Sequence, residues 1–163
     1  MNNNIINIRQ VGKEITALIT EIPHRSHSMY KVMFESGYEN IFFTDVETGK
    51  WIEEDLGFTI LASNVGEEIK KISQNFFHVP KILTWHKQEK GGKLISFGFY
   101  KFMTGISETY EIYSSNKKYM YTIANTNNVE WHVVGSTVEM LDKTDCSFIQ
   151  NLTKILPFYY PNI

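Results

Sequence analysis

Two histidines in one polar segment are the first side chains whose spacing could support chemistry. His24 and His27 are three positions apart, and such a pair can supply two ligands to a metal ion. A zinc site needs at least three protein ligands, whereas His78, His86 and His132 are scattered along the chain. Neither Cys-x-x-Cys nor His-Glu-x-x-His spacing occurs, so no metal site is expected. His86 and His132 fall on predicted strands, where a cross-strand pair is the alternative to ordinary strand histidines.

An acidic concentration is the second candidate for chemistry. It consists of Asp45, Glu47, Glu53, Glu54 and Asp55. Such a group can bind a hard cation or provide an acid–base pair, but the spacing is not that of an EF-hand. Turn chemistry and the start of a helix account for each acid. The corresponding stretch of the second half, at residues 125–128, keeps turn character without any charge. A structural role is therefore favoured over catalysis.

Cys146 is the only cysteine and lies near the start of a predicted helix, where the thiol pKa can fall. No nearby base in the sequence supports a nucleophile, and a single cysteine cannot form an internal disulfide. A reducing cytoplasm is therefore the expected location, because no signal peptide and no membrane-length apolar run are visible. Glycine-rich and Walker-type nucleotide motifs are absent, so no cofactor is expected. The net charge of −2 offers no general attraction to nucleic acid or anionic membranes.

The strands and helices that must position these residues are predicted from a sequence pattern that returns 80 positions later in the chain. Five residues of Ile5–Trp51 are identical to their counterparts, among 47 positions aligned without a gap. The identities are Gly12 with Gly92, Lys13 with Lys93, Ile15 with Ile95, Tyr30 with Tyr110, and Trp51 with Trp131. A helical pattern follows each Trp. The sequence therefore predicts a tandem duplication within one compact domain, with halves at residues 1–78 and 79–163.

Helical spacing follows the strands of each half. In the first half, apolar residues at steps of three and four predict a helix over Thr59–Phe76. The stripe comprises Leu61, Val65, Ile69, Ile72 and Phe76. Gly66 lies inside this helix at a cost of roughly 1 kcal/mol relative to alanine, which indicates a close approach of the helix to the sheet. A shorter second helix is predicted with Asp145 as its cap.

Period-two alternation and short turns predict antiparallel strands before each helix. Tyr30, Val32 and Phe34 share one face of a strand in the first half. The predicted fold class is α+β, with a predominantly antiparallel sheet of about seven to nine strands and two helices packed on one face. This sheet is built from two tandem strands-then-helix repeats.

Several predicted strands are apolar on both faces, so we expect the side away from the helices to be covered. A partner subunit, a curl of the sheet or a ligand could provide this cover. Phe97 and Phe99 share one face of their strand, and Tyr119 and Tyr121 share a face of another. The segment Ile95–Phe102 resembles the aromatic core of the RNP1 strand of RNA-recognition motifs.

The RNP1 likeness stops at the aromatic residues. Ile95 and Ser96 occupy the places of the basic–glycine pair, and strands rather than a helix follow the segment. Nucleic acid is therefore not the expected partner. The leading hypothesis is a non-enzymatic cytoplasmic protein that binds through an aromatic sheet face and forms a homodimer or takes a protein partner. Phe97, Phe99, Tyr119 and Tyr121 would make this contact.

Two further hypotheses remain open. The first is a small-molecule pocket between sheet and helices, lined by Trp51, Trp131, Tyr30 and Tyr110, with each Trp otherwise serving as a buried anchor. The second is a small enzyme that uses His24, His27 or the acids of residues 45–55. An enzyme requires these groups to converge in one cleft, whereas the pocket requires the four aromatic residues to face a common space.

Overall fold

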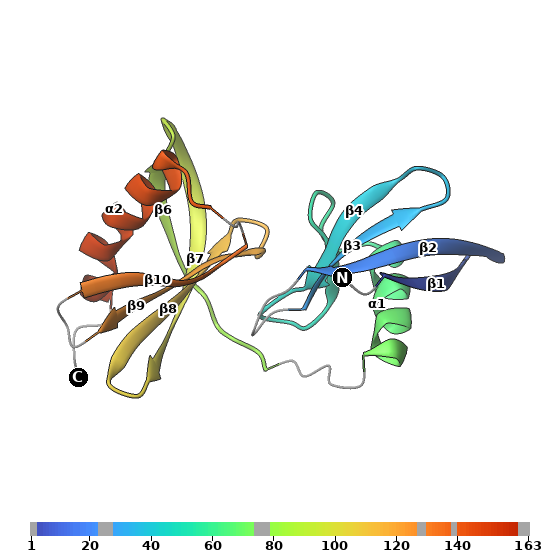
Figure 1. Cartoon of the computed structure of the whole chain (residues 1–163), viewed down its shortest axis with the longest axis horizontal. Helices are drawn as coiled ribbons and strands as arrows, with labels where there is room; N and C mark the ends of the chain where they lie inside the picture. Colours follow the sequence, from blue (N-terminus) through green and yellow to red (C-terminus); the bar gives the residue numbers. More distant parts are fainter. Residues whose placement is uncertain (1–2, 23–27, 74–78, 127–129, 138–139, 160–163) are drawn as a thin grey trace. The chain divides into compact units, whose positions relative to one another are not determined.

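The computed structural model describes residues 3–22, 28–73, 79–126, 130–137 and 140–159. The chain divides into two compact units, Met1–Ile82 and Leu83–Ile163. Each unit contains a five-stranded antiparallel sheet in which strands adjacent in the sequence are neighbours, followed by one helix (Figure 1). The predicted fold class, α+β with two tandem strands-then-helix repeats, is confirmed. The strands do not form one sheet of seven to nine, however, because β5 and β6 belong to separate sheets.

Unit 1 follows the sheet order β1-β2-β3-β4-β5. Its elements are β1 (Asn3–Gln10), β2 (Lys13–Ile22), β3 (Met29–Phe34), β4 (Glu39–Thr44), β5 (Trp51–Glu53) and α1 (Ile60–Ile72). Unit 2 has the order β10-β9-β8-β7-β6. Its elements are β6 (Thr84–Lys90), β7 (Lys93–Thr104), β8 (Ser107–Ser114), β9 (Tyr119–Thr126), β10 (Glu130–Ser136) and α2 (Lys143–Tyr159).

Strand pairing repeats at the offset of 80 found in the sequence. Gln10 pairs with Lys13 in the first hairpin, and Lys90 pairs with Lys93 in its counterpart. Val11 and Gly12 have φ angles of 49° and 74°, and Gly91 and Gly92 have 59° and 76°. Positive φ at both central residues is the type I′ geometry that matches strand twist in a two-residue hairpin. The next pair of strands also keeps its register, since Ala17 pairs with Phe34 and Phe97 with Ser114.

Helix α1 covers one face of the first sheet. Ala62, Val65, Gly66 and Ile69 are its buried residues, whereas Ile72 of the predicted stripe is 46% exposed. The contact face is therefore rotated toward Ala62 and Gly66. A Cβ atom at Gly66 would lie 2.1 Å from Cδ1 of Trp51. The glycine thus allows the indole of β5 to press against the helix backbone, as the close approach inferred from the sequence requires.

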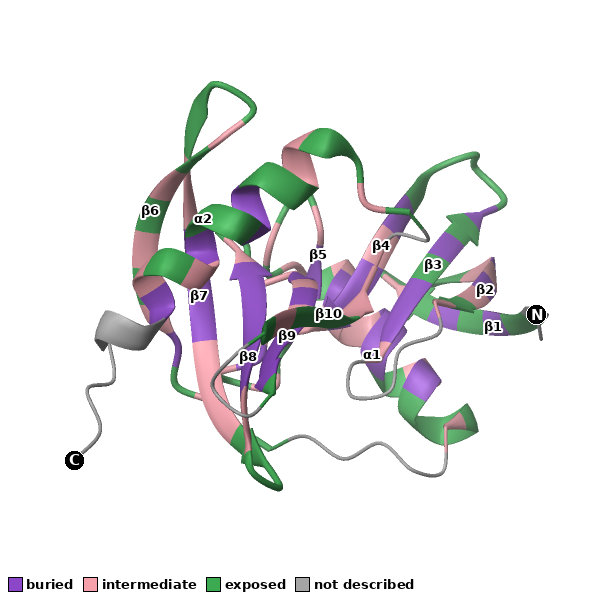
Figure 2. Cartoon of the chain, turned by 60° about the vertical axis from the view of Figure 1, so that its left-hand side comes forward, coloured by how far each residue is buried: buried purple, intermediate pink, exposed green. Residues whose placement is uncertain are grey.

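Helix α2 covers the second sheet with larger side chains. Phe148 and Leu152 are buried against Phe97, Tyr110 and other residues of β7–β9. The rings of Phe148 and Phe97 meet edge-on, with centroids 5.5 Å apart. Figure 2 shows buried residues along the central strands and exposed residues on the outward sides of both helices. Neither helix within the described residues is long and apolar enough to cross a membrane.

Buried side chains also occupy the sheet faces away from the helices. In unit 1, Met29, Phe43 and Ile52 form a separate small cluster. In unit 2, Glu111 and Tyr113 are 3% and 1% exposed, and the Tyr113 hydroxyl donates to Glu111 Oε2 at 2.7 Å. Burial, together with the charge of Glu111, raises the pKa of Tyr113 and keeps the hydroxyl protonated. The expectation that strands are apolar on both faces agrees with this burial pattern.

Candidate interaction surface

The four aromatic residues expected to form an open binding face are buried. Phe97 and Phe99 are 0% exposed, Tyr121 3% and Tyr119 2%. Phe97, Phe99 and Tyr121 belong to the core that α2 covers. A bulge in the β8–β9 pairing places Tyr121 opposite Ile112 but Tyr119 opposite Tyr113, and therefore on the other side of the sheet. These four residues thus do not form one accessible surface, because a partner could reach three of them only by displacing α2.

The two aromatic pairs expected to line a pocket lie in different units. The Tyr30 and Trp51 ring centroids are 5.9 Å apart at 43°, and those of Tyr110 and Trp131 are 5.6 Å apart at 44°. The repeated residues therefore make the same tilted contact in each half. Tyr30, Trp51 and Tyr110 are at most 5% exposed, and Trp131 packs against the core of unit 2. Each pair anchors the core of its own unit.

Of the four histidines considered for a site, the structure describes His86 and His132. His24 and His27 lie outside the described residues. His86 is on β6 and His132 on β10, which are the opposite edges of the second sheet. The alternative of a cross-strand pair is therefore excluded, because three strands separate the two histidines, and the favoured interpretation as separate strand histidines stays. Within the described ranges, no group of three or more His, Cys, Asp or Glu side chains is arranged to hold a metal ion.

Two of the acids of residues 45–55, Asp45 and Glu53, accept hydrogen bonds around β5 through their carboxylates. Asp45 Oδ1 accepts hydrogen bonds from the Glu47 amide at 2.8 Å and the Thr48 amide at 3.2 Å, which closes the turn before the strand. Glu53 is 1% exposed on β5. The amide of Glu54 donates to the Ile41 carbonyl at 2.9 Å and extends the contact with β4. These positions agree with the structural role that the sequence favoured.

Glu53 accepts hydrogen bonds from three side chains. The Tyr38 hydroxyl donates to Oε2 and the Thr59 hydroxyl donates to Oε1. Asn40 Nδ2 donates to Oε2 at 3.4 Å and to the Tyr38 hydroxyl oxygen at 3.0 Å. Burying a carboxylate is costly unless hydrogen bonds replace its hydration. Burial raises the pKa of Tyr38, and its bond to Glu53 raises it further, so this hydroxyl remains a donor.

This network fixes the connection between β5 and α1. The backbone amides of Glu53 and Gly57 donate to each other's carbonyl oxygens at 2.8 and 2.9 Å, and Gly57 has a φ of 72°. Thr59 is the helix N-cap and accepts from the Ala62 amide at 2.9 Å. Because Thr59 also donates to Glu53, the buried carboxylate holds both the loop and the first turn of the helix.

Large apolar side chains project from the connection that Glu53 holds. Leu56 is 64% exposed, Phe58 61% and Ile60 73%. We call these three residues the apolar ridge. Lys50 Nζ lies 5.5 Å from the centroid of the Phe58 ring, in cation–π geometry. The ridge therefore combines exposed apolar surface with a backbone that a buried hydrogen-bond network holds in place.

The sequence prediction missed this ridge, although one signal was present. Ile60 falls outside the apolar stripe of the helix. Leu56, Phe58 and Ile60 occupy every second position, with a small or polar residue between them. Those three side chains were assigned to no core and to no site. Their exposure follows from the position of Glu53, whose partners come from β3–β4 and from the start of α1. No local pattern shows that this particular acid is the buried one.

The equivalent joint in unit 2 has a different construction. The amide of Asp145 donates to Asp142 Oδ1 at 2.7 Å, and the Asp142 amide donates to Asp145 Oδ2 at 3.3 Å. Asp142 is therefore the cap and Asp145 its reciprocal partner three residues later, which corrects the assignment of Asp145 as the cap. Lys90 Nζ lies 2.6 Å from Asp145 Oδ1, and the Tyr121 hydroxyl donates to the same oxygen. The exposed thiol of Cys146 follows in this first turn.

The charges of this joint stabilise one another. Burial favours a higher pKa for Asp145, but hydrogen bonds from Lys90, Tyr121 and the Asp142 backbone outweigh it and lower the pKa. Burial likewise favours a lower pKa for Lys90, yet its bonds to Asp145 and Tyr121 raise it. Burial and the bond to Asp145 raise the pKa of Tyr121 to about 12. Tyr121 therefore stays protonated near neutral pH. Its hydrogen bond and the ion pair from Lys90 hold Asp145, and with it the first turn of α2, against the sheet.

No protein-family model, no curated protein and no solved structure matches the chain.

Proposed function

We propose that the protein works by binding another protein through the apolar ridge of Leu56, Phe58 and Ile60. The observation that supports this function is the exposure of all three side chains, above 60%, at the junction of loop and helix that a 1% exposed carboxylate holds. Single exposed apolar residues are common on protein surfaces, whereas contiguous groups of them mark interaction sites. The three residues lie within five consecutive positions of a segment that backbone and side-chain hydrogen bonds hold, so little conformational entropy is lost on binding.

The size of the ridge suits the centre of an interface. Complete burial of a large apolar side chain contributes roughly 1.5–3 kcal/mol, and aromatic residues are frequent among the residues that dominate binding energy. Phe58 would be the central contact, with Leu56 and Ile60 on either side. Tyr38, 39% exposed and bonded to Glu53, would extend the same surface.

The charges beside the ridge favour a protein partner over a membrane. Asp55 is exposed directly before Leu56, and a carboxylate at that position opposes contact with anionic lipid headgroups. Lys50 lies over Phe58, so both signs of charge border the apolar centre, as at the polar rim of a protein interface. The proposal places this binding in the cytoplasm, where the free thiol of Cys146 would remain reduced.

Site-specific photocrosslinking tests the proposal. A photoreactive phenylalanine analogue at position 58 is expected to give one discrete adduct with a partner protein in cells. The same analogue at Val11, which is 96% exposed in the β1–β2 turn, is the matched control and should not give that adduct. Phe58→Ser with the analogue at Leu56 should weaken the adduct by about ten-fold or more. Equal adducts at positions 58 and 11, or none at position 58, would refute the proposal.

A further inference from the structure

Strands β1 and β6 are equivalent edge strands of the two sheets. Each is the first strand of its unit and, among the residues that the structure describes, pairs on one side only, β1 with β2 and β6 with β7. Residues that flank a two-residue hairpin turn exchange backbone hydrogen bonds with each other. Even-numbered residues from Gln10 backwards therefore bond to β2, and odd-numbered residues direct their N–H and C=O groups to the outer edge. The same holds for β6, because its register is the same.

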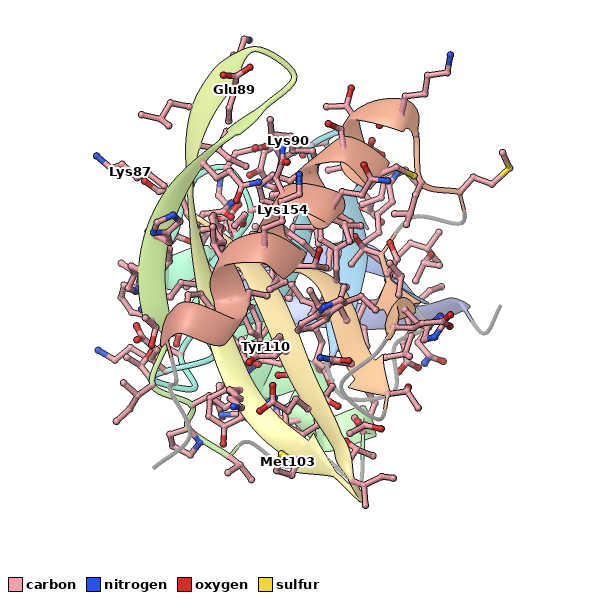
Figure 3. All side chains as sticks on the ribbon, turned by 90° about the vertical axis from the view of Figure 1, so that its left-hand side faces the viewer. Lys87, Glu89, Lys90, Met103, Tyr110 and Lys154 are labelled. Atoms are coloured by element: carbon pink, nitrogen blue, oxygen red, sulfur yellow. The ribbon has the colours of Figure 1, made fainter. Side chains whose placement is uncertain are left out.

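The two edges differ in charge. At the outward positions of β6, Lys87 and Glu89 are exposed, and Figure 3 shows both side chains along the strand. In β1, Asn7 occupies the position that corresponds to Lys87. The preceding outward position of β1 is Ile5, which is 71% exposed. Charged side chains protect a sheet edge from pairing with another strand, and proline and bulges have the same effect. Strand β6 has this protection, whereas residues 3–8 of β1 contain no charge and no proline.

Only the N-terminal part of β1 is available for a new strand. Asn64 of α1 donates through Nδ2 to the carbonyl oxygen of Arg9 at 3.1 Å, which occupies an outward acceptor near the end of the strand. The single charge of β1, on Arg9, lies at the same end. The outward backbone groups of Ile5 and Asn7 remain in the uncharged part, so a pairing strand fits residues 3–7.

We propose that β1 pairs antiparallel with β1 of a second copy of the chain, with the two-fold axis at Ile5. In this register Ile5 lies opposite Ile5 of the other copy, and Asn7 lies opposite Asn3. Each Arg9 lies four residues from the axis, about 14 Å away at roughly 3.4 Å per residue, so the two like charges are not opposed. The two five-stranded sheets of unit 1 then form one continuous sheet.

The alternative centres are less favourable. An axis at Asn7 would place Arg9 opposite Ile5 and would require the Arg9 carbonyl that Asn64 already holds. An axis at Ile6 would place Arg9 opposite Asn3 and would require the same Arg9 carbonyl. A second copy fits the edge because the segment is neutral and places the exposed Ile5 opposite Ile5 of the other copy. This contact is separate from the apolar ridge, so the two proposals can fail independently.

Disulfide trapping tests the register. In a Cys146→Ser background, Ile5→Cys is expected to form a covalent dimer on mild oxidation, because hydrogen-bonded antiparallel pairs have Cα atoms about 5.5 Å apart and disulfides span roughly 4.4–6.8 Å. Asn7→Cys should not crosslink, since its two copies would lie about 14 Å apart. Lys87→Cys on the charged edge of β6 is the matched control and should remain monomeric under oxidation. Crosslinking at position 87 or 7 but not at 5 would overturn the proposal.

Sedimentation equilibrium tests the association itself. The unmodified chain is expected to dimerise, and Ile5→Lys should weaken the dimer by at least about ten-fold because two like charges would face each other. Phe58→Ser should leave the dimer unchanged, which separates this contact from the ridge. A wild-type chain that is monomeric throughout, or a dimer unaffected by Ile5→Lys, would overturn the proposal. If the Ile5→Cys variant crosslinks to a different protein and forms no dimer, a second copy of the chain is not what pairs with the edge of β1.

Discussion

Replacement of Glu53 by alanine should lower the free energy of unfolding of unit 1 by more than a substitution of a single side chain on the surface does. The carboxylate accepts bonds from Tyr38, Thr59 and Asn40 while being 1% exposed. Truncation leaves these donors without their acceptor in a buried site, and each such loss costs about 1–3 kcal/mol, partly recovered if water enters. We therefore expect a loss of about 2–4 kcal/mol in the free energy of unfolding of unit 1. Glu53→Gln keeps the shape and one carbonyl acceptor, so its loss should be about half as large.

Urea unfolding followed by amide NMR signals of unit 1 measures this effect. Hydrogen exchange at the Ala62 amide, which bonds to Thr59, should accelerate in the same variants. Glu67→Ala is the matched control, because Glu67 is 62% exposed in a surface pair with Lys70 and should cost at most a few tenths of a kcal/mol. A Glu53→Ala loss below about 1 kcal/mol, or a loss equal to that of Glu67→Ala, would refute the assignment of Glu53 as the support of the ridge.

Three further changes test the packing and the helix starts. Gly66→Ala should destabilise unit 1 by about 1–3 kcal/mol despite the better helix propensity of alanine, because the new Cβ would meet the Trp51 ring; urea unfolding would measure this loss, and a gain in stability would contradict the contact. Asp142→Ala should lower the stability of unit 2 by about 1 kcal/mol through loss of the N-cap, measured by chemical denaturation. Asp145→Asn should lower stability at neutral pH but not in strong acid. The folded pKa of Asp145 is lowered, so its contribution is present above the unfolded value of 3.8 and disappears as the pH falls through the folded pKa. Thermal unfolding at several pH values would measure this, and a constant difference between Asp145→Asn and wild type would argue against the ion pair with Lys90.

The two units solve one structural problem in two ways. In each, the first turn of the helix is attached to strands of the preceding sheet. Unit 1 uses the uncharged cap Thr59 and a buried acid on β5. Unit 2 uses a reciprocal pair of aspartates and draws in Lys90 from the first hairpin. Leu56, Phe58 and Ile60 are exposed beside the cap in unit 1, whereas Met140 is the large apolar side chain exposed beside the cap in unit 2, so the repeat preserves the architecture while the surfaces diverge.

Much of the architecture was readable from local sequence. Period-two alternation and glycine-containing turns predicted the strands, and identities at an offset of 80 predicted that the second half repeats the first. The hairpin registers agree with that offset because turn geometry determines pairing. Gly66 indicated the close approach that Trp51 then makes. Each of these features is visible in the sequence itself, either as a local pattern or as the return of that pattern 80 positions later.

The accessible surfaces were decided only by tertiary structure. The sequence could show that Phe97, Phe99 and Tyr121 share an apolar face, but not that α2 buries that face. It likewise placed five acids near β5 without showing that Glu53 alone would be enclosed among hydroxyl donors. Exposure depends on contacts between residues distant in the chain, and such contacts leave no periodic pattern in the sequence. Residue spacing therefore determined the elements and their repetition, whereas packing determined which side chains remain available to bind.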